Sequence, residues 1–83
     1  MLVAADPVNI GKRIRSIREI MGITQTELGN KLDVKREIIR RYESGHSKVA
    51  LKNIRRLTEI ADALSIPGYK ICVADLLMES GNA

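Results

Sequence analysis

Aliphatic residues recur at every third or fourth position along the chain, in short runs that turn-forming residues interrupt. The first run shows the spacing, because Ile10, Ile14, Ile17 and Met21 share one face of a helix. Trp and Phe are absent and the chain has 2 Tyr, so the core has to be built from branched aliphatic side chains. The pattern predicts an all-α fold of five short helices, and 83 residues allow one domain.

The composition excludes several classes of protein. The single cysteine, Cys72, leaves no internal disulfide and so no secreted disulfide scaffold. No apolar run approaches the length of about 18 residues that crosses a membrane, and the N-terminus lacks the basic flank of a signal peptide. Two Tyr are too few for platforms that stack single-stranded bases. We therefore expect a cytoplasmic protein with no membrane contact.

We also expect no enzymatic activity. The chain has 1 His, no glycine-rich phosphate loop and no cluster of Cys and His. It thus offers neither a catalytic constellation nor a set of metal ligands. We predict no catalytic residue, no cofactor and no metal.

The basic excess is confined to the first half of the chain. The formal net charge is +4, with ten Lys or Arg against five Asp or Glu in residues 8–48 and four of each in residues 49–83. Such an excess is either an ordinary solvated surface or a site for a polyanion such as nucleic acid. The helices that carry these charges decide between the two interpretations.

Start signals define the first two helices. Asp6 and Pro7 are typical of an N-cap and a first helical residue, so we expect a helix to begin at Pro7 or a few residues later. The segment from Thr24 to Glu27 is a capping box for a short second helix. Gly29 inside that helix indicates that another backbone crosses it closely.

Three further helices are expected. The third runs from about Lys35 to Ser44 and carries a strongly charged face, and a loop over 46–49 follows it. The fourth runs from about Leu51 to Leu64, and a short last helix covers 74–78 after a break at 65–68. We divide the chain into an N-terminal arm (1–7), a domain with a C-terminal dimerisation segment (8–78) and a flexible tail (79–83).

Two short helices joined by a tight turn, the second of them basic and exposed, have the geometry of a helix-turn-helix. At this level residues 10–77 resemble the Xre/Cro-like, phage lambda-repressor-like group of helix-turn-helix transcriptional regulators. The resemblance rests on Ile10–Arg15, Arg18, Gly22–Leu28, Lys31–Val34, Ile39, Tyr42–Gly45, Ile60, Ala61 and Leu64. It implies a five-helix domain that binds double-stranded DNA and reads the major groove with the helix at about 35–44.

The chain departs from the family pattern at several positions. Gly29 stands where the family usually has Ala, and Asp33 stands in the turn where it usually has Gly. Asp tolerates a positive φ better than most residues, so we expect the turn to persist. Lys35 replaces the usual Ser or Thr cap, which costs about 1 kcal/mol but brings a cation close to a phosphate. The segment between Gly45 and Ala61 is longer than usual, and residues 67–72 are an insertion.

The resemblance assigns the base contacts to the first exposed residues of the third helix. These are Arg36 and Glu37, with Arg41 one turn further on. Arg suits the two acceptors of guanine, and Glu accepts from the amino group of cytosine. Alternatively these residues form a solvated face, in which Glu37 and Arg41 merely pair. Ile38 either meets a thymine methyl group or belongs to the core.

The resemblance also implies phosphate contacts, which orient a protein on DNA without reading sequence. Gln25 at the start of the second helix is the first, and the N–H groups of a helix N-terminus favour an anion there. The further candidates, each of which is otherwise ordinary surface, are Lys35, Arg40, Ser44, His46 and Lys48. His46 is expected to be a hydrogen-bonding loop residue and not a metal ligand.

One charged pair is expected to serve the structure and not the DNA. In related repressors the residues that match Arg18 and Glu43 form a partly buried ion pair between the first and third helices. Removing one partner of such a pair costs about 3–5 kcal/mol where burial is deep.

Family members bind palindromes as two-fold dimers. The neutral C-terminal segment offers a homodimer interface made of Tyr69, Ile71, Val73, Leu76, Leu77 and Met78, although Leu76 and Leu77 could instead close the core of the monomer. We expect a sequence-specific regulator, in the first place a repressor that occludes a promoter at a palindromic operator. The alternative is an antitoxin of this fold that neutralises a toxin partner and regulates its own operon.

Overall fold

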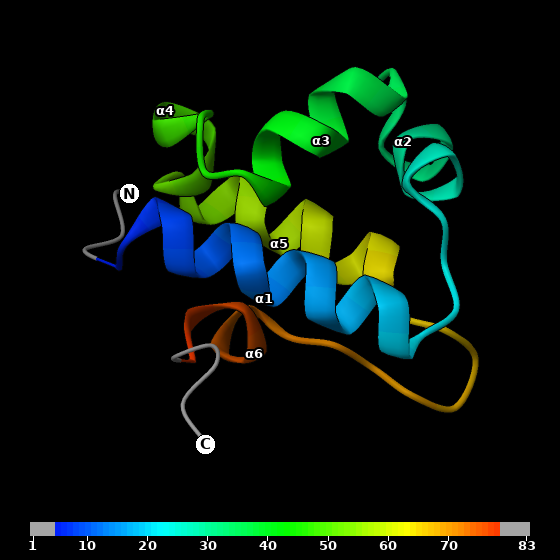
Figure 1. The fold of residues 1–83 in the computed structure, drawn as a ribbon. Coiled ribbons are helices and arrows are strands. Elements are labelled where there is room, and N and C mark those ends of the chain that lie inside the picture. The colour runs from blue at the N-terminus through cyan, green and yellow to red at the C-terminus, as the bar shows by residue number, and fades with distance from the viewer. Residues whose placement is uncertain (1–4, 79–83) are drawn as a thin grey trace.

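The computed structural model describes residues 5–78, which form six helices and no strand (Figure 1). The helices are α1 (Pro7–Ile20), α2 (Gln25–Leu32), α3 (Arg36–Glu43), α4 (Lys48–Leu51), α5 (Ile54–Leu64) and α6 (Val73–Leu77). The predicted all-α class is confirmed. The predicted tail and residues 1–4 of the predicted arm lie outside the described residues.

The described residues form six helices where five were expected, because a short extra helix lies in the segment that was expected to be a loop. Residues 48–51, of which 48 and 49 were assigned to a loop, form α4, and α5 begins only at Ile54. The side chain of Asn53 caps α5, since its Oδ1 accepts from the backbone N–H groups of Arg55 (2.9 Å) and Arg56 (3.2 Å). An Asn that bonds the backbone in this way favours a helix start over a helix interior.

The predicted caps of the first two helices are confirmed. Asp6 Oδ1 accepts from the backbone N–H of Val8 (3.0 Å), and α1 begins at Pro7 without delay. Thr24 and Glu27 form both bonds of the capping box, because Thr24 Oγ1 accepts from the N–H of Glu27 (3.0 Å) and Glu27 Oε1 accepts from the N–H of Thr24 (2.8 Å).

Glycine lets α3 approach its neighbours closely. A Cβ at Gly11 in α1 would lie 2.7 Å from the carbonyl oxygen of Glu43, and the carbonyl oxygen of Tyr42 is nearer still. A Cβ at Gly29 in α2 would lie 2.7 Å from the carbonyl oxygen of Val34. The close crossing predicted at Gly29 is therefore present, and Gly11 makes a second one. The contact at Gly11 lets α3 pack closely on α1, and the contact at Gly29 lets the turn between α2 and α3 fold back on α2.

The core is aliphatic apart from one ring. Fully buried side chains come from all of the longer helices, and they include Ile10, Ile14, Leu28, Ile39, Leu51, Leu57, Ile60, Leu64 and Leu76. Tyr42 of α3 is also buried, and its hydroxyl accepts a hydrogen bond of 3.0 Å from Arg56 Nε. The guanidinium carbon of Arg56 lies 5.6 Å from the centre of the Tyr42 ring, within the range of a cation–π contact.

The C-terminal segment packs on the side of α1 that faces away from α3 (Figure 1). Residues 65–71 form a turn in which Ser65 Oγ accepts from the N–H of Ile71 (2.8 Å). Arg13 Nε in α1 donates to the carbonyl oxygen of Asp75 (3.0 Å), which joins α6 to α1. In Figure 1, α1 lies between α3 above it and α6 below it.

Two residues assigned to the dimer interface belong to the core of the chain itself. Ile71 is 4% exposed and Leu76 is 0% exposed, so neither has surface to offer a partner. Leu76 thus has the alternative role that was expected for it, closing the core of the monomer, and the assignment of Ile71 is corrected to the same role.

Candidate nucleic-acid interface

The turn between α2 and α3 sets the orientation of α3 relative to α2. Asp33 ends α2 in the left-handed conformation (φ 57°), as expected, and the N–H of Val34 donates to the carbonyl oxygen of Gly29 (2.8 Å). Lys35 occupies the N-cap position of α3 without a side-chain hydrogen bond to the helix. A Ser or Thr at this position would accept from one backbone N–H group of the first turn, and with Lys35 there that group receives no bond from the capping side chain.

The helix α3 is divided sharply into an inner and an outer face. Ile39, Tyr42 and Glu43 are buried, and Ile38 is half-buried and packs against the core. The outer face consists of charged and exposed residues, which are Arg36, Glu37, Arg40 and Arg41. The predicted base contacts from Arg36, Glu37 and Arg41 thus lie on the exposed face, whereas Ile38 is mainly a packing residue.

One acidic and one basic residue of this outer face are paired. Arg40 Nη2 lies 2.6 Å from Glu37 Oε2, and Arg40 Nε donates to Glu37 Oε1 (3.2 Å). The hydrogen bond from Arg40 lowers the pKa of Glu37 and the carboxylate raises the pKa of Arg40. The partner of Glu37 is therefore Arg40 and not Arg41. Within residues 5–78 the guanidinium of Arg41 has no ion-pair partner.

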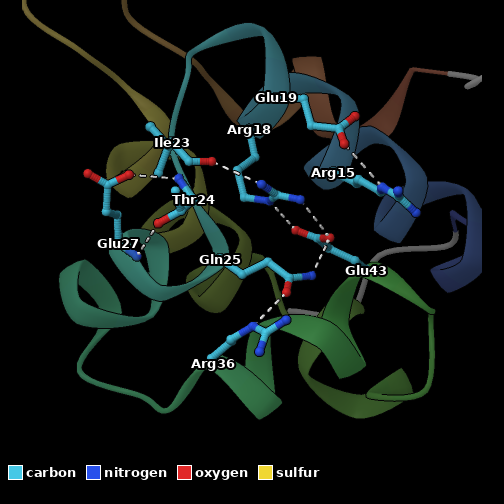
Figure 2. A network of polar contacts seen from close by, with 9 residues as sticks. All are labelled: Arg15, Arg18, Glu19, Ile23, Thr24, Gln25, Glu27, Arg36 and Glu43. Carbon is cyan, nitrogen blue, oxygen red and sulfur yellow. Dashed lines mark hydrogen bonds and ion pairs between the residues drawn. The ribbon is translucent and has the colours of Figure 1, made fainter.

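A second set of polar contacts reaches from α1 through α2 to the start of α3 (Figure 2). Arg18 Nε lies 2.5 Å from Glu43 Oε2. The two side chains, which were expected to form a structural ion pair, are both buried. Gln25 Nε2 donates to Glu43 Oε1 (3.1 Å), and Gln25 Oε1 accepts from Arg36 Nε (3.1 Å). Sequence reasoning missed both contacts of Gln25, because residues 18 and 11 positions apart carry no local pattern that links them.

The remaining phosphate candidates are exposed and lie beyond the end of α3 or before its start. Lys35 precedes α3, whereas Ser44, His46 and Lys48 follow it. Ser44 Oγ and His46 Nδ1 are 2.6 Å apart, and Ser44 Oγ also donates to the carbonyl oxygen of Arg41 (3.1 Å). Polar donors thus stand at both ends of the basic helix, with Gln25 beside its first turn.

The other candidates for a dimer interface differ in exposure. Tyr69 is 62% and Met78 is 56% exposed, whereas Val73 and Leu77 are half-buried against the core. Ile20, at the end of α1, is 78% exposed and was not among the predicted interface residues. It borders a small pocket together with Tyr69, so the exposed apolar surface extends from the turn at 66–69 onto α1.

The described part of the chain has neither a membrane-spanning helix nor a cluster of metal-binding side chains. None of its helices combines the length and the apolar character that crossing a bilayer requires. Residues 5–78 also hold no group of three His, Cys, Asp or Glu side chains arranged to bind a metal ion.

The compact bundle, the tight turn after Asp33 and the outward basic face of α3 define a helix-turn-helix domain. A family model described as helix-turn-helix matches residues 14–67, which is more than half of the chain. The chain therefore belongs to the Xre/Cro-like helix-turn-helix family of transcriptional regulators.

Its relatives carry names of the same kind. A protein of Pyrococcus abyssi whose name includes the words HTH-type transcriptional regulatory protein is 44% identical over 52 residues, which are 63% of this chain and 16% of that protein. A similarly named Pyrococcus furiosus protein is 42% identical over the same length and the same shares of the two chains. An uncharacterized HTH-type transcriptional regulator of Sinorhizobium medicae is 30% identical over 60 residues, 72% of this chain and 41% of that protein. The chain thus spans less than half of each of these relatives. No solved structure matches it.

Proposed function

We propose that this chain binds double-stranded DNA in a sequence-specific way and regulates transcription, with α3 in the major groove. The single observation that carries the proposal is the outer face of α3, which exposes three arginines and one acidic residue, Glu37. The major groove of B-DNA admits a helix and presents a different set of donors and acceptors for each base pair. The membership of the family supports the same function.

We assign the base contacts to Arg36 and Arg41, with Glu37 as a third reader. The terminal nitrogens of both arginines have no partner within residues 5–78, so no internal bond has to break before they meet a base. Glu37 must first exchange Arg40 for a cytosine amino group. The pair is exposed, with side chains 58% and 65% accessible, and exposed pairs of this kind contribute only about 0–1 kcal/mol.

We assign the phosphate contacts to Gln25, Lys35, Arg40, Ser44, His46 and Lys48, which surround α3. Such contacts release counterions, so the affinity falls steeply as salt is added. A repressor that acts by occluding a promoter needs no further activity than this binding. A palindromic operator and a cytoplasmic location remain predictions of the sequence, and a toxin partner belongs to the alternative antitoxin function.

The experiment that tests the function is the selection of bound sequences from random duplex DNA, followed by footprinting. We expect a defined site for the wild-type chain. Arg36→Ala should relax the base preference at one position of each half-site, at a cost of about 1–3 kcal/mol. Lys48→Ala should weaken all duplexes alike and flatten the salt dependence. Retained preference in Arg36→Ala would contradict the assignment of Arg36, and no enriched site at all would contradict the function.

We further propose that the chain forms a homodimer through the exposed apolar surface that Tyr69 shares with Ile20. Met78 lies at the other end of α1, where its carbonyl oxygen accepts from Asn9. The exposed Ile20 supports a contact there, because large apolar side chains seldom gather on the surface of a monomer without a partner. Tyr69→Lys should shift sedimentation toward the monomer while the fold persists. A tight complex with an unrelated small protein, and no self-association, would instead favour the antitoxin function.

A further inference from the structure

Glu37 is the acidic residue of the outer face of α3, and three arginines surround it. Arg36 precedes it, and Arg40 and Arg41 lie one turn further along the same face. The hydrogen bond from Arg40 lowers the pKa of Glu37 most, and the charges of all three guanidinium groups lower it further. The carboxylate therefore enters a DNA groove as an anion, beside a backbone that is itself anionic.

Arg40 occupies both oxygens of this carboxylate. Its Nε donates to Glu37 Oε1 (3.2 Å) and its Nη2 donates to Glu37 Oε2 (2.6 Å). Long side chains in a helix lean toward its N-terminus, which brings Arg40 back over the residue three positions earlier. Within residues 5–78 neither side chain forms a second hydrogen bond or ion pair. In the free protein each group is thus the sole side-chain partner of the other.

The strength of this pair depends on the water around it. In the free protein the side chains of Arg40 and Glu37 are 65% and 58% exposed, so water screens their attraction. When α3 enters the major groove, water leaves both groups, and the attraction rises because the effective dielectric constant falls. A carboxylate without a partner in that position is costly. Glu37 therefore retains Arg40 in the groove unless a base supplies another donor.

The base at this position decides whether such a donor is present. In the major groove N4 of cytosine donates, whereas O4 of thymine and the N7 and O6 atoms of guanine only accept. Cytosine can thus replace Arg40 on the carboxylate, and the guanidinium of Arg40 is then released. A released guanidinium beside DNA has the phosphate oxygens as acceptors, and it binds them by charge-assisted hydrogen bonds.

We propose that the Glu37–Arg40 pair links the reading of a base to a phosphate contact: the amino group of a cytosine replaces Arg40 on Glu37, and the released Arg40 binds a phosphate. At a base pair that lacks this amino group, Arg40 stays on Glu37 and the phosphate contact is not made. The inference rests on the proposed function. It adds that Glu37 and Arg40 act as one unit, so a wrong base removes two contacts together.

The test measures how the affinity depends on salt for two duplexes. One is the selected duplex, and the other has a T·A pair at the C·G position whose preference Glu37→Ala relaxes, which puts the O4 acceptor of thymine where the amino group was. The slope of log K against log salt concentration falls by about 0.9 for each phosphate contact that is lost. We expect wild type to bind the T·A duplex about tenfold more weakly, with a slope smaller by about one contact.

Two variants separate the halves of the exchange. Glu37→Ala leaves Arg40 free for a phosphate on either duplex, so its two slopes should be equal. Arg40→Ala removes the phosphate contact from both duplexes, so its two slopes should also be equal, while the preference for cytosine persists. Because the slopes are compared within each variant, the change in its net charge cancels.

Lys48→Ala is the matched control, because it removes a proposed phosphate contact that does not involve Glu37. Its slope should fall on both duplexes, and the difference between the two slopes should stay as in wild type. The far-ultraviolet circular dichroism of all four proteins should be the same, since the three changed side chains are exposed.

The failures of the two proposals can be told apart. Equal slopes for wild type on the two duplexes would overturn the exchange, and so would an unchanged slope for Arg40→Ala on the selected duplex. If Glu37→Ala relaxes no preference for cytosine, this inference is wrong and the function stands on Arg36 and Arg41. If wild type enriches no sequence at all, the proposed function fails and this inference fails with it.

Discussion

Arg18 Nε lies 2.5 Å from Glu43 Oε2 and Arg18 Nη2 lies 3.2 Å from Glu43 Oε1, so one two-pronged ion pair joins α1 to the end of α3. Both residues are buried, and the third bond of Arg18 reaches the backbone of the loop before α2. The guanidinium of Arg18 in α1 therefore holds both the end of α3 and the loop that leads into α2.

Removing Arg18 should be strongly destabilising. Arg18→Met leaves the Glu43 carboxylate buried with only Gln25 as a donor, and we expect the free energy of unfolding to fall by about 3–5 kcal/mol. Urea titration followed by far-ultraviolet circular dichroism measures it. The double variant Arg18→Met with Glu43→Leu removes both charges and should lose less than Arg18→Met alone. If the double variant is less stable than Arg18→Met, the attraction between the two charges exceeds the cost of removing them from water.

Gly11→Ala should destabilise the domain, although Ala is the better helix former by about 1 kcal/mol. The added Cβ would meet the carbonyl oxygens of Tyr42 and Glu43, which are backbone atoms and cannot turn aside. Overpacking of this kind typically costs about 1–3 kcal/mol, and here α1 and α3 have to separate. The melting temperature checks the result.

Gly22→Ala is the matched control for Gly11→Ala. Gly22 has φ +71° and no atom near its missing Cβ, so its cost comes from the left-handed backbone alone. It should leave DNA binding unchanged, whereas Gly11→Ala should displace α3 and weaken binding. Equal binding losses in both variants would contradict the role of Gly11 in seating α3.

Lys35→Ser should raise stability and lower DNA affinity at the same time. Lys35 is an N-cap residue without a capping bond, so a hydroxyl at this position should stabilise the fold by about 0.5–2 kcal/mol. The loss of a cation beside α3 should flatten the salt dependence of binding by about one charge. Lys35→Ala removes the charge and supplies no cap, so it should show the second effect without the first.

The capping box of α2 should make stability depend on acid pH. The hydrogen bond from the backbone of Thr24 holds the pKa of Glu27 below its usual value. The charged form is thus favoured by folding, so its contribution is fully present above the unfolded-state pKa and is lost as pH falls through the folded-state pKa. Glu27→Gln retains an acceptor without a charge, and its denaturation midpoint should fall less than that of wild type on acidification. Parallel acid profiles would contradict the prediction.

Much of the fold could be predicted because its signals are local. The caps at Asp6 and Thr24 and the left-handed turn at Asp33 each depend on neighbours within a few residues, and the structure has all three. The start of α5 at Ile54 was not predicted, because the aliphatic pattern continues on both sides of Asn53. Its cap bonds to Arg55 and Arg56 outweigh that periodicity.

The candidate site could be predicted only in part. The exposed positions of α3 follow from helical periodicity, since the buried Ile39, Tyr42 and Glu43 leave the arginines outside. The spacing of residues along the helix does not predict which partner each exposed side chain contacts. Glu37 pairs with Arg40 and not with Arg41, and Gln25 contacts Arg36. These contacts could not be predicted, because they depend on side-chain rotamers and on how two helices cross.

The aliphatic core gives the protein an unusual optical character. Without Trp or Phe, its near-ultraviolet absorption and its fluorescence come from its two Tyr rings, one buried beside Arg56 and one open to water. Tyr69→Leu would therefore turn Tyr42 into the sole chromophore of the chain. Its near-ultraviolet dichroism would then report directly on whether α3 remains seated.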